Sequence, residues 1–218
     1  CDRRQRQMCI RDSERTTYTT TVSNVMIDNE NTSTVTNILD LKTSAKIPVI
    51  KIADGIAQES FSFCLKEITG NINEVVNDPN GNVALKDGVN LAEQALVEPN
   101  RTVIITPGDA TSAQMTDTAE FTFEYTPKSI SETHWYAIAE QAGATPNVSY
   151  DDTAYLVKVD VSLSGERSLD TSEKIYKAVR GSRKLEEVTG DNVGVTFENV
   201  AIKYLSLIHI SEPTRLGM

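Results

Sequence analysis

The 218-residue chain is acidic, with a formal net charge of −10, and no basic cluster lies beyond its first 13 residues. This charge argues against nucleic acid and anionic membranes as partners. No run of about 18 apolar residues occurs, so the sequence predicts no membrane span. Of the three cysteines and two histidines, only Cys64 and His134 lie between residues 14 and 204, so this part of the sequence offers no disulfide framework and no Cys pair for a metal, and no cofactor is expected.

The two ends of the chain resemble translated adapter sequence from DNA sequencing libraries. Residues 8–13 and 205–210 can be encoded by DNA strings that are reverse complements of each other, which two unrelated termini have no reason to be. We therefore expect residues 1–13 and 205–218 to be adapter-derived, and we exclude them from reasoning about the fold. The alternative is a basic N-terminal arm and an apolar C-terminal segment. Without these ends, Cys64 is the only cysteine.

Most of the remaining chain is predicted to form strands, because it is rich in Thr and Val and its apolar residues alternate with polar ones. Residues 14–45 contain two strand-like pieces and are expected to be a linker or the C-terminal end of a preceding repeat. Residues 46–204 are expected to form one all-β domain. Its clearest alternating segments are residues 47–53, 61–65, 121–125, 135–140, 155–163 and 193–199.

Two stretches between these strands are less regular. The connection over residues 71–119 is long, and residues 91–96 within it are predicted to form one or two helical turns. Residues 172–189 fit a short helix and an irregular strand equally well. The fold predicted from the pattern is therefore an all-β domain with a long inserted connection that holds a short helix.

Three polar residues share strand faces with apolar residues. Alternation groups Lys51 with Ile47, Val49 and Ala53. It groups Glu140 with Tyr136 and Ile138, and Asn199 with Val193, Val195 and Phe197. The opposite face of the Lys51 strand is also apolar, so parity there permits burial without requiring it. Because an isolated buried charge is costly, the three groups are expected to pair or to become neutral. The same parity predicts that Cys64 faces solvent.

Burial would give these three groups a specific chemistry. A desolvated lysine is shifted toward its neutral, nucleophilic amine, and a desolvated glutamate toward its protonated acid. The acid could then hydrogen-bond to the amide oxygen of Asn199. The Lys51 amine would attack the amide carbon and expel ammonia, while Glu140 transfers the protons between the groups. The alternative is a Lys51–Glu140 ion pair at a strand end, with Asn199 capping a turn.

Four motifs resemble the repeat domain of Gram-positive backbone pilins. They are Phe-x-Phe-x-Leu from Phe61, Tyr-x-Ile-x-Glu to Glu140, Tyr-Asp-x-Thr-x-Tyr-x-Val-x-Val from Tyr150, and Phe-x-Asn to Asn199. The resemblance covers residues 46–204 and implies an immunoglobulin-like sandwich with an internal Lys–Asn isopeptide bond. It assigns the amine to Lys51, the catalytic acid to Glu140 and the amide to Asn199. Asn37 ends a Thr-x-x-Asn segment similar to the one that ends at Asn199, and it is expected to be the terminal amide of an upstream repeat.

The resemblance implies a structural repeat of a pilus shaft or cell-wall surface protein. The chain would then be extracellular, its partners would be neighbouring repeats or sortase-joined pilin subunits, and its chemistry would be a single self-crosslinking turnover rather than enzymatic activity. The alternative is an adhesin module on the same scaffold, similar to collagen-adhesin B-type domains, in which residues 71–119 bind a host-surface ligand. A β-sandwich hydrolase fragment has weak support, because only His134 could serve as its base.

Overall fold

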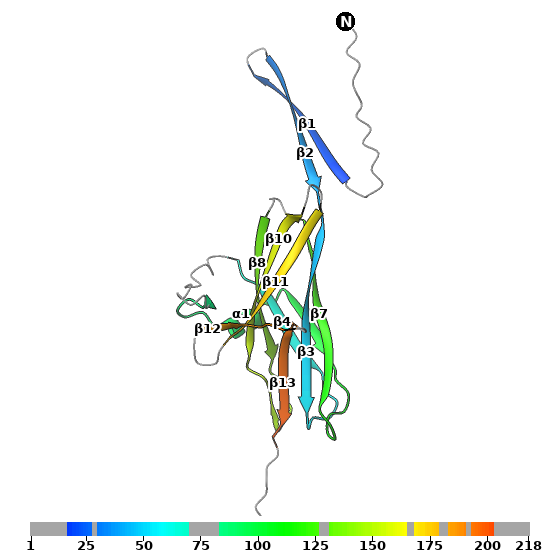
Figure 1. Ribbon diagram of the computed structural model, residues 1–218, viewed down its shortest axis with the longest axis vertical. Coiled ribbons are helices and arrows are strands. Elements are labelled where there is room, and N and C mark those ends of the chain that lie inside the picture. The colour runs from blue at the N-terminus through cyan, green and yellow to red at the C-terminus, as the bar shows by residue number, and fades with distance from the viewer. Residues whose placement is uncertain are drawn as a thin grey trace, which may run out of the picture. The chain divides into compact units, whose positions relative to one another are not determined.

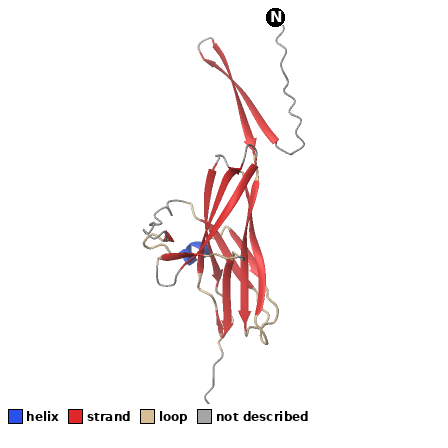
Figure 2. Cartoon of the chain, in the orientation of Figure 1, coloured by secondary structure: helices blue, strands red, loops and turns tan. Residues whose placement is uncertain are grey.

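The computed structural model describes residues 17–27, 30–69, 83–126, 131–164, 168–178, 183–190 and 193–202. The regular structure in this part of the chain is almost entirely β (Figure 2). Two sheets, of seven and four strands, confirm the predicted all-β sandwich. The adapter hypothesis concerns residues 1–13 and 205–218, which lie outside the described residues. No helix in the described ranges is long and apolar enough to cross a membrane.

The larger sheet has the order β5-β12-β11-β10-β8-β4-β6. Figure 1 labels β4, β8, β10, β11 and β12 among its strands. In chain order its strands are β4 (Phe61–Glu67), β5 (Val83–Ala84), β6 (Arg101–Ile105), β8 (Ser131–Gln141), β10 (Ala154–Ser164), β11 (Ser168–Ala178) and β12 (Lys184–Glu187). Strand β4 pairs antiparallel with β8, and this register sets Phe63 beside Glu140. Within residues 172–189, which fitted helix and strand equally well, the described residues form the end of β11, up to Ala178, and the whole of β12.

The smaller sheet has the order β7-β3-β13-β9 and joins the beginning of the domain to its end. Its strands are β3 (Thr43–Asp54), β7 (Met115–Tyr125), β9 (Val148–Ser149) and β13 (Val195–Ala201). Strands β3 and β13 pair in parallel, with Phe197 opposite Lys51 and Asn199 opposite Ala53. In Figure 1 the orange β13 accordingly lies beside the cyan β3.

Alternation in β3 turns one face of the strand into the core. Every second residue from Ala45 to Ala53 is buried, and Lys51 takes its place in that row at 0% exposure. Asn199 follows the buried Val195 and Phe197 in β13 in the same way. Val193 was expected on this face but is 38% exposed, because it precedes the first residue of β13.

The predicted helical turns within residues 71–119 are confirmed as α1 (Leu91–Leu96). The side-chain oxygen of Asn90 caps this helix by accepting hydrogen bonds from the backbone N–H groups of Ala92 (3.1 Å) and Glu93 (3.3 Å). Beyond the helix the connection returns as β6, which pairs antiparallel with β4. The described part of this long connection therefore adds a strand to each edge of the larger sheet, β6 beside β4 and β5 beside β12.

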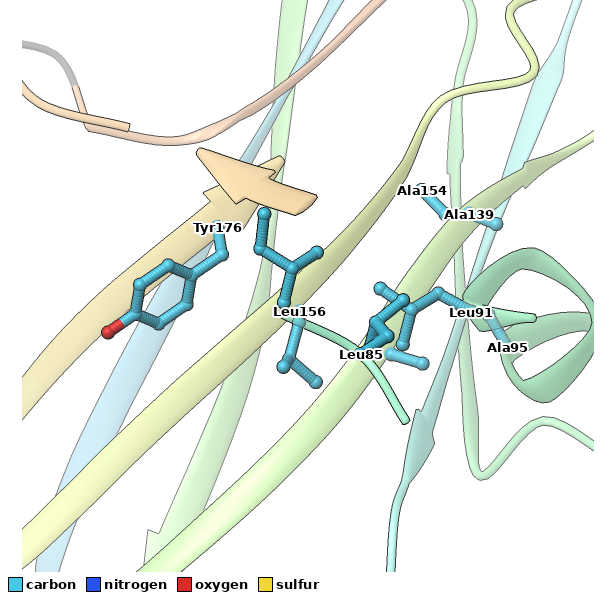
Figure 3. Close-up of a cluster of buried hydrophobic side chains, with 9 residues drawn as sticks. Leu85, Leu91, Ala95, Ala139, Ala154, Leu156 and Tyr176 are labelled. Carbon is cyan, nitrogen blue, oxygen red and sulfur yellow. The ribbon is translucent and has the colours of Figure 1, made fainter. Parts of the chain in front are cut away.

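The prediction that Cys64 faces solvent is wrong, because its side chain is only 3% exposed. The second face of β8 and β10 carries a buried apolar cluster, whose members include Ala139, Leu156 and, from α1, Leu91 (Figure 3). Figure 3 shows these side chains gathered between the sheet and the helix. Ala139 stands opposite Cys64 in the β4–β8 register. Parity assigned Cys64 to the correct face, but a segment distant in sequence covers that face.

The described residues form two compact units. One contains residues 47–121 and 135–157 and the chain from Lys174 onward, and it holds the side chains considered below. The other contains the chain up to Lys46 together with residues 122–134 and 158–173. Within that second unit, β1 (Thr17–Ile27) and β2 (Glu30–Asp40) form an antiparallel hairpin. These are the two strand-like pieces expected in residues 14–45.

Candidate functional site

Lys51, Glu140 and Asn199 come together inside one compact unit of the chain. Two of them come from the neighbouring parallel strands β3 and β13, and Glu140 comes from β8 of the other sheet. Each side chain points inward because its strand alternates, so the two sheets bring the three groups into the space between them. The residues selected by parity in the sequence are thus neighbours in the structure.

The carboxylate of Glu140 links the other two side chains. Its Oε2 accepts a hydrogen bond from Lys51 Nζ at 2.9 Å, and its Oε1 accepts one from Asn199 Nδ2 at 2.6 Å. One oxygen therefore contacts the amine and the other contacts the amide nitrogen. A carboxyl group in this position can take a proton from one nitrogen and return a proton to the other.

The interior around these groups contains little water-accessible surface. Lys51 and Asn199 are 0% exposed, and Glu140 is 4% exposed. The Lys51 ammonium position lies 4.5 Å from the centre of the Phe61 ring and 5.8 Å from that of Phe63. These aromatic rings form an apolar wall around the polar groups.

Desolvation dominates the protonation of the pair. Burial lowers the pKa of Lys51 below its ordinary value, although the hydrogen bond and charge of Glu140 act in the opposite direction. Burial likewise raises the pKa of Glu140, against the opposing influence of Lys51 and Asn199. Both shifts favour the uncharged forms, a free amine beside a carboxylic acid. These forms are the nucleophile and the proton donor that amide chemistry requires.

The orientation of the Asn199 amide differs from the one expected from sequence. We expected Glu140 to hydrogen-bond to the amide oxygen, but Glu140 contacts the amide nitrogen instead. The oxygen Oδ1 accepts a hydrogen bond from the backbone N–H of Asp151 at 2.8 Å. Because an N–H group needs an acceptor, this contact holds Oδ1 toward Asp151 and turns Nδ2 toward Glu140.

Sequence reasoning did not assign a role to Asp151 or Tyr155, although both lie in the Tyr-Asp-x-Thr-x-Tyr motif. The Tyr155 hydroxyl donates a hydrogen bond to the Thr196 carbonyl (2.6 Å) and accepts one from the Thr196 N–H (3.2 Å), which ties β10 to β13. Burial raises the pKa of Tyr155 to about 12. Its ring also packs edge-on against Phe197, with 5.3 Å between centroids. The motif was visible in the sequence, but its contacts depend on the neighbouring strand.

Asn37 lies in β2, where its backbone is opposite Thr20 in the hairpin. Its side chain falls outside what the structure describes, so its assignment as an upstream amide stays a prediction. Across the described ranges, no group of three or more His, Cys, Asp and Glu side chains is arranged to hold a metal ion.

No protein-family model and no curated protein sequence matches this chain. Among solved structures, it is similar to the major pilin from Streptococcus pyogenes, with 24% identity, a TM-score of 0.41, and coverage of 72% of this chain and 50% of that one. A second major pilin structure from the same species has 16% identity and a TM-score of 0.42, covering 73% of this chain and 53% of that one. The chain thus spans about half the length of these structures. Similarity at this level does not establish a family.

Proposed function

We propose that Lys51 and Asn199 join in an intramolecular isopeptide bond, formed once with Glu140 as the proton-transferring acid. The proposal depends chiefly on one observation: a buried Glu140 carboxyl group contacts both Lys51 Nζ at 2.9 Å and Asn199 Nδ2 at 2.6 Å. A simple ion pair needs only the first of these contacts. The second places the same carboxyl group on the nitrogen that must leave.

The atoms of the reaction balance within the three side chains. The neutral Lys51 amine forms a bond to Asn199 Cγ, and the Cγ–Nδ2 bond breaks. Glu140 accepts one proton from Nζ and supplies one to Nδ2, so ammonia leaves and the carboxyl group ends as it began. Holding the amine, acid and amide together in a dry interior provides the effective concentration that an unactivated amide needs.

The biological role that fits this chemistry is structural. A bond between β3 and β13 would connect the beginning of the domain to its end, which suits a repeat in an extracellular pilus shaft or cell-wall surface protein. The four motifs that resemble backbone pilins support this role, as does the presence of a single cysteine, Cys64, between the two adapter-like ends. Its partners would be neighbouring repeats or pilin subunits, which sortase would join.

Intact-mass spectrometry tests the bond directly. The purified protein is expected to be about 17 Da lighter than its sequence mass, because one ammonia is lost. Peptide mapping should then recover a branched fragment that contains both Lys51 and Asn199. A mass equal to the sequence sum in the correctly folded protein would exclude the proposal. The variant Asn199→Ala, which has no side-chain amide, provides the unlinked reference.

The rate of bond formation is expected to depend on pH with a bell-shaped profile. Lys51 and Glu140 must share a single proton, since two protons leave no nucleophile and none leaves no acid. Burial raises the Glu140 pKa above its ordinary 4.5, so the acidic limb should lie above that value. Burial lowers the Lys51 pKa below its ordinary 10.5, so the alkaline limb should lie below that value.

This profile can be measured by diluting denatured, unlinked protein into buffers of different pH and following the mass with time. Circular dichroism at each pH serves as the control for folding. A rate that rises steadily with pH up to the ordinary range of lysine would show that no acid takes part, and would contradict the role given to Glu140.

A further inference from the structure

The connection between β9 and β10 contacts the reactive amide from the side opposite Glu140. It consists of residues 150–153, and the N–H of Asp151 donates to Asn199 Oδ1 at 2.8 Å. Attack on an amide carbon moves the carbonyl electron pair onto this oxygen. A fixed N–H at hydrogen-bond distance is the group that stabilises such a developing negative charge.

The side chain of Asp151 holds that N–H in place. Its Oδ1 accepts a hydrogen bond from the Thr153 N–H at 2.8 Å, which closes a tight turn within the connection. Its Oδ2 accepts one from the Glu198 N–H, also at 2.8 Å, which fastens the connection to β13. Glu198 directly precedes Asn199 in the chain. Two hydrogen bonds therefore connect Asp151 to this part of β13: its N–H donates to Asn199 Oδ1, and its Oδ2 accepts from the N–H of Glu198.

We propose that Asp151 is a positioning residue for isopeptide formation: its carboxylate fixes its own backbone N–H as the oxyanion donor for Asn199. This inference rests on the proposed function. When Lys51 Nζ bonds to Asn199 Cγ, the carbonyl pair moves to Oδ1, where the Asp151 N–H stabilises it. The pair returns to reform the carbonyl as the Cγ–Nδ2 bond breaks and Glu140 delivers the proton that completes ammonia.

The same contact determines which amide atom leaves. If the amide were reversed, Nδ2 would face the Asp151 N–H, which would place two donors against each other, and Oδ1 would face Glu140. The fixed N–H disfavours that arrangement. It therefore directs Nδ2, the departing nitrogen, toward the carboxyl group that also contacts Lys51. Orientation and charge stabilisation both follow from one hydrogen bond.

The variant Asp151→Ala tests the positioning role. Denatured, unlinked protein is diluted to start folding, and the loss of ammonia is followed by intact mass. We expect bond formation to slow by about 10- to 100-fold, because the N–H donor loses both hydrogen bonds that fix it. Asp151→Asn, which retains one acceptor oxygen, should recover part of the rate. Asp152→Ala removes the same charge from the neighbouring exposed residue and should react at the wild-type rate.

An amide-to-ester substitution at position 151, made with the α-hydroxy acid analogue of aspartate, tests the donor itself. It removes the N–H and leaves the carboxylate in place, so we expect bond formation to slow by about 100- to 1,000-fold. If Asp151→Ala does not fold, the reaction rate of the ester variant tests the inference by itself. A folded ester variant that reacts at the wild-type rate overturns the inference while the isopeptide proposal stands. If the wild-type protein itself loses no ammonia, the proposed function fails instead.

Discussion

Replacement of Glu140 with alanine is expected to give a protein that keeps its full sequence mass and is markedly less stable. Without the carboxyl group, no proton can be moved from Lys51 to the departing nitrogen, so the bond does not form. The proposed cross-link would enclose roughly 150 residues, and its absence should cost about 5 kcal/mol on the loop-entropy model. Removal of the Glu140 carboxyl group also leaves the buried Lys51 amine and Asn199 amide without this hydrogen-bond partner, which costs about 1–3 kcal/mol more. Intact mass and urea unfolding measure the two effects.

Two further variants separate the causes of this result. Glu124→Ala deletes an exposed carboxylate from β7, and it should retain the ammonia loss and the wild-type stability. Lys51→Met removes the nucleophile and fills the same space with apolar atoms, so it should lose the stability from the cross-link, while Glu140, whose pKa is raised by burial, stays as a neutral acid in contact with Asn199. Complete ammonia loss in folded Glu140→Ala would show that Glu140 is dispensable and that the assignment is wrong.

Replacement of Phe197 with alanine is expected to reduce the free energy of unfolding by about 3–5 kcal/mol. The Phe197 ring is fully buried between the Phe63 ring, 5.0 Å away, and the Tyr155 ring, 5.3 Å away. It also stands opposite Lys51 in the parallel register. A cavity here would admit water beside the amine and favour its charged form, so bond formation should slow as well.

The matched control for this variant is Leu156→Ala. Leu156 is equally buried but belongs to the cluster on the other face of the larger sheet, with Leu91 and Ala95 of α1 (Figure 3). Its truncation should cost about 2–5 kcal/mol by the same cavity argument. The rate of ammonia loss should nevertheless stay at the wild-type value. Equal slowing in both variants would mean that general loosening of the fold, rather than hydration of Lys51, limits the reaction.

Period-two alternation was sufficient to predict much of this arrangement from the sequence. It placed Glu140 and Asn199 on inward faces, among positions that apolar residues fill, and it permitted the burial of Lys51. It also predicted an all-β chain with a short helix. These features depend on the order of neighbouring residues, which can be read directly from the sequence.

The features that were missed depend on contacts between distant segments. Cys64 is buried because the face on which it lies also packs an apolar cluster that includes residues of α1. The orientation of the Asn199 amide follows from a backbone N–H, that of Asp151, and no side-chain pattern reveals such a donor. The pairing of β6 with β4 likewise required the path of the chain. Alternation indicates which face is buried, but not what covers it.

The parallel pairing of β3 and β13 has a consequence for the way the domain transmits tension. Because β3 and β13 are parallel, the N-terminal end of β3 and the C-terminal end of β13 lie at opposite ends of the strand pair. Tension applied to these two ends loads all hydrogen bonds between the strands in shear rather than breaking them one at a time. With Lys51 bonded to Asn199, tension would pass directly from one strand to the other. The residues between them would bear none of it, and connections such as residues 71–119 could vary in length without altering the extensibility of the domain.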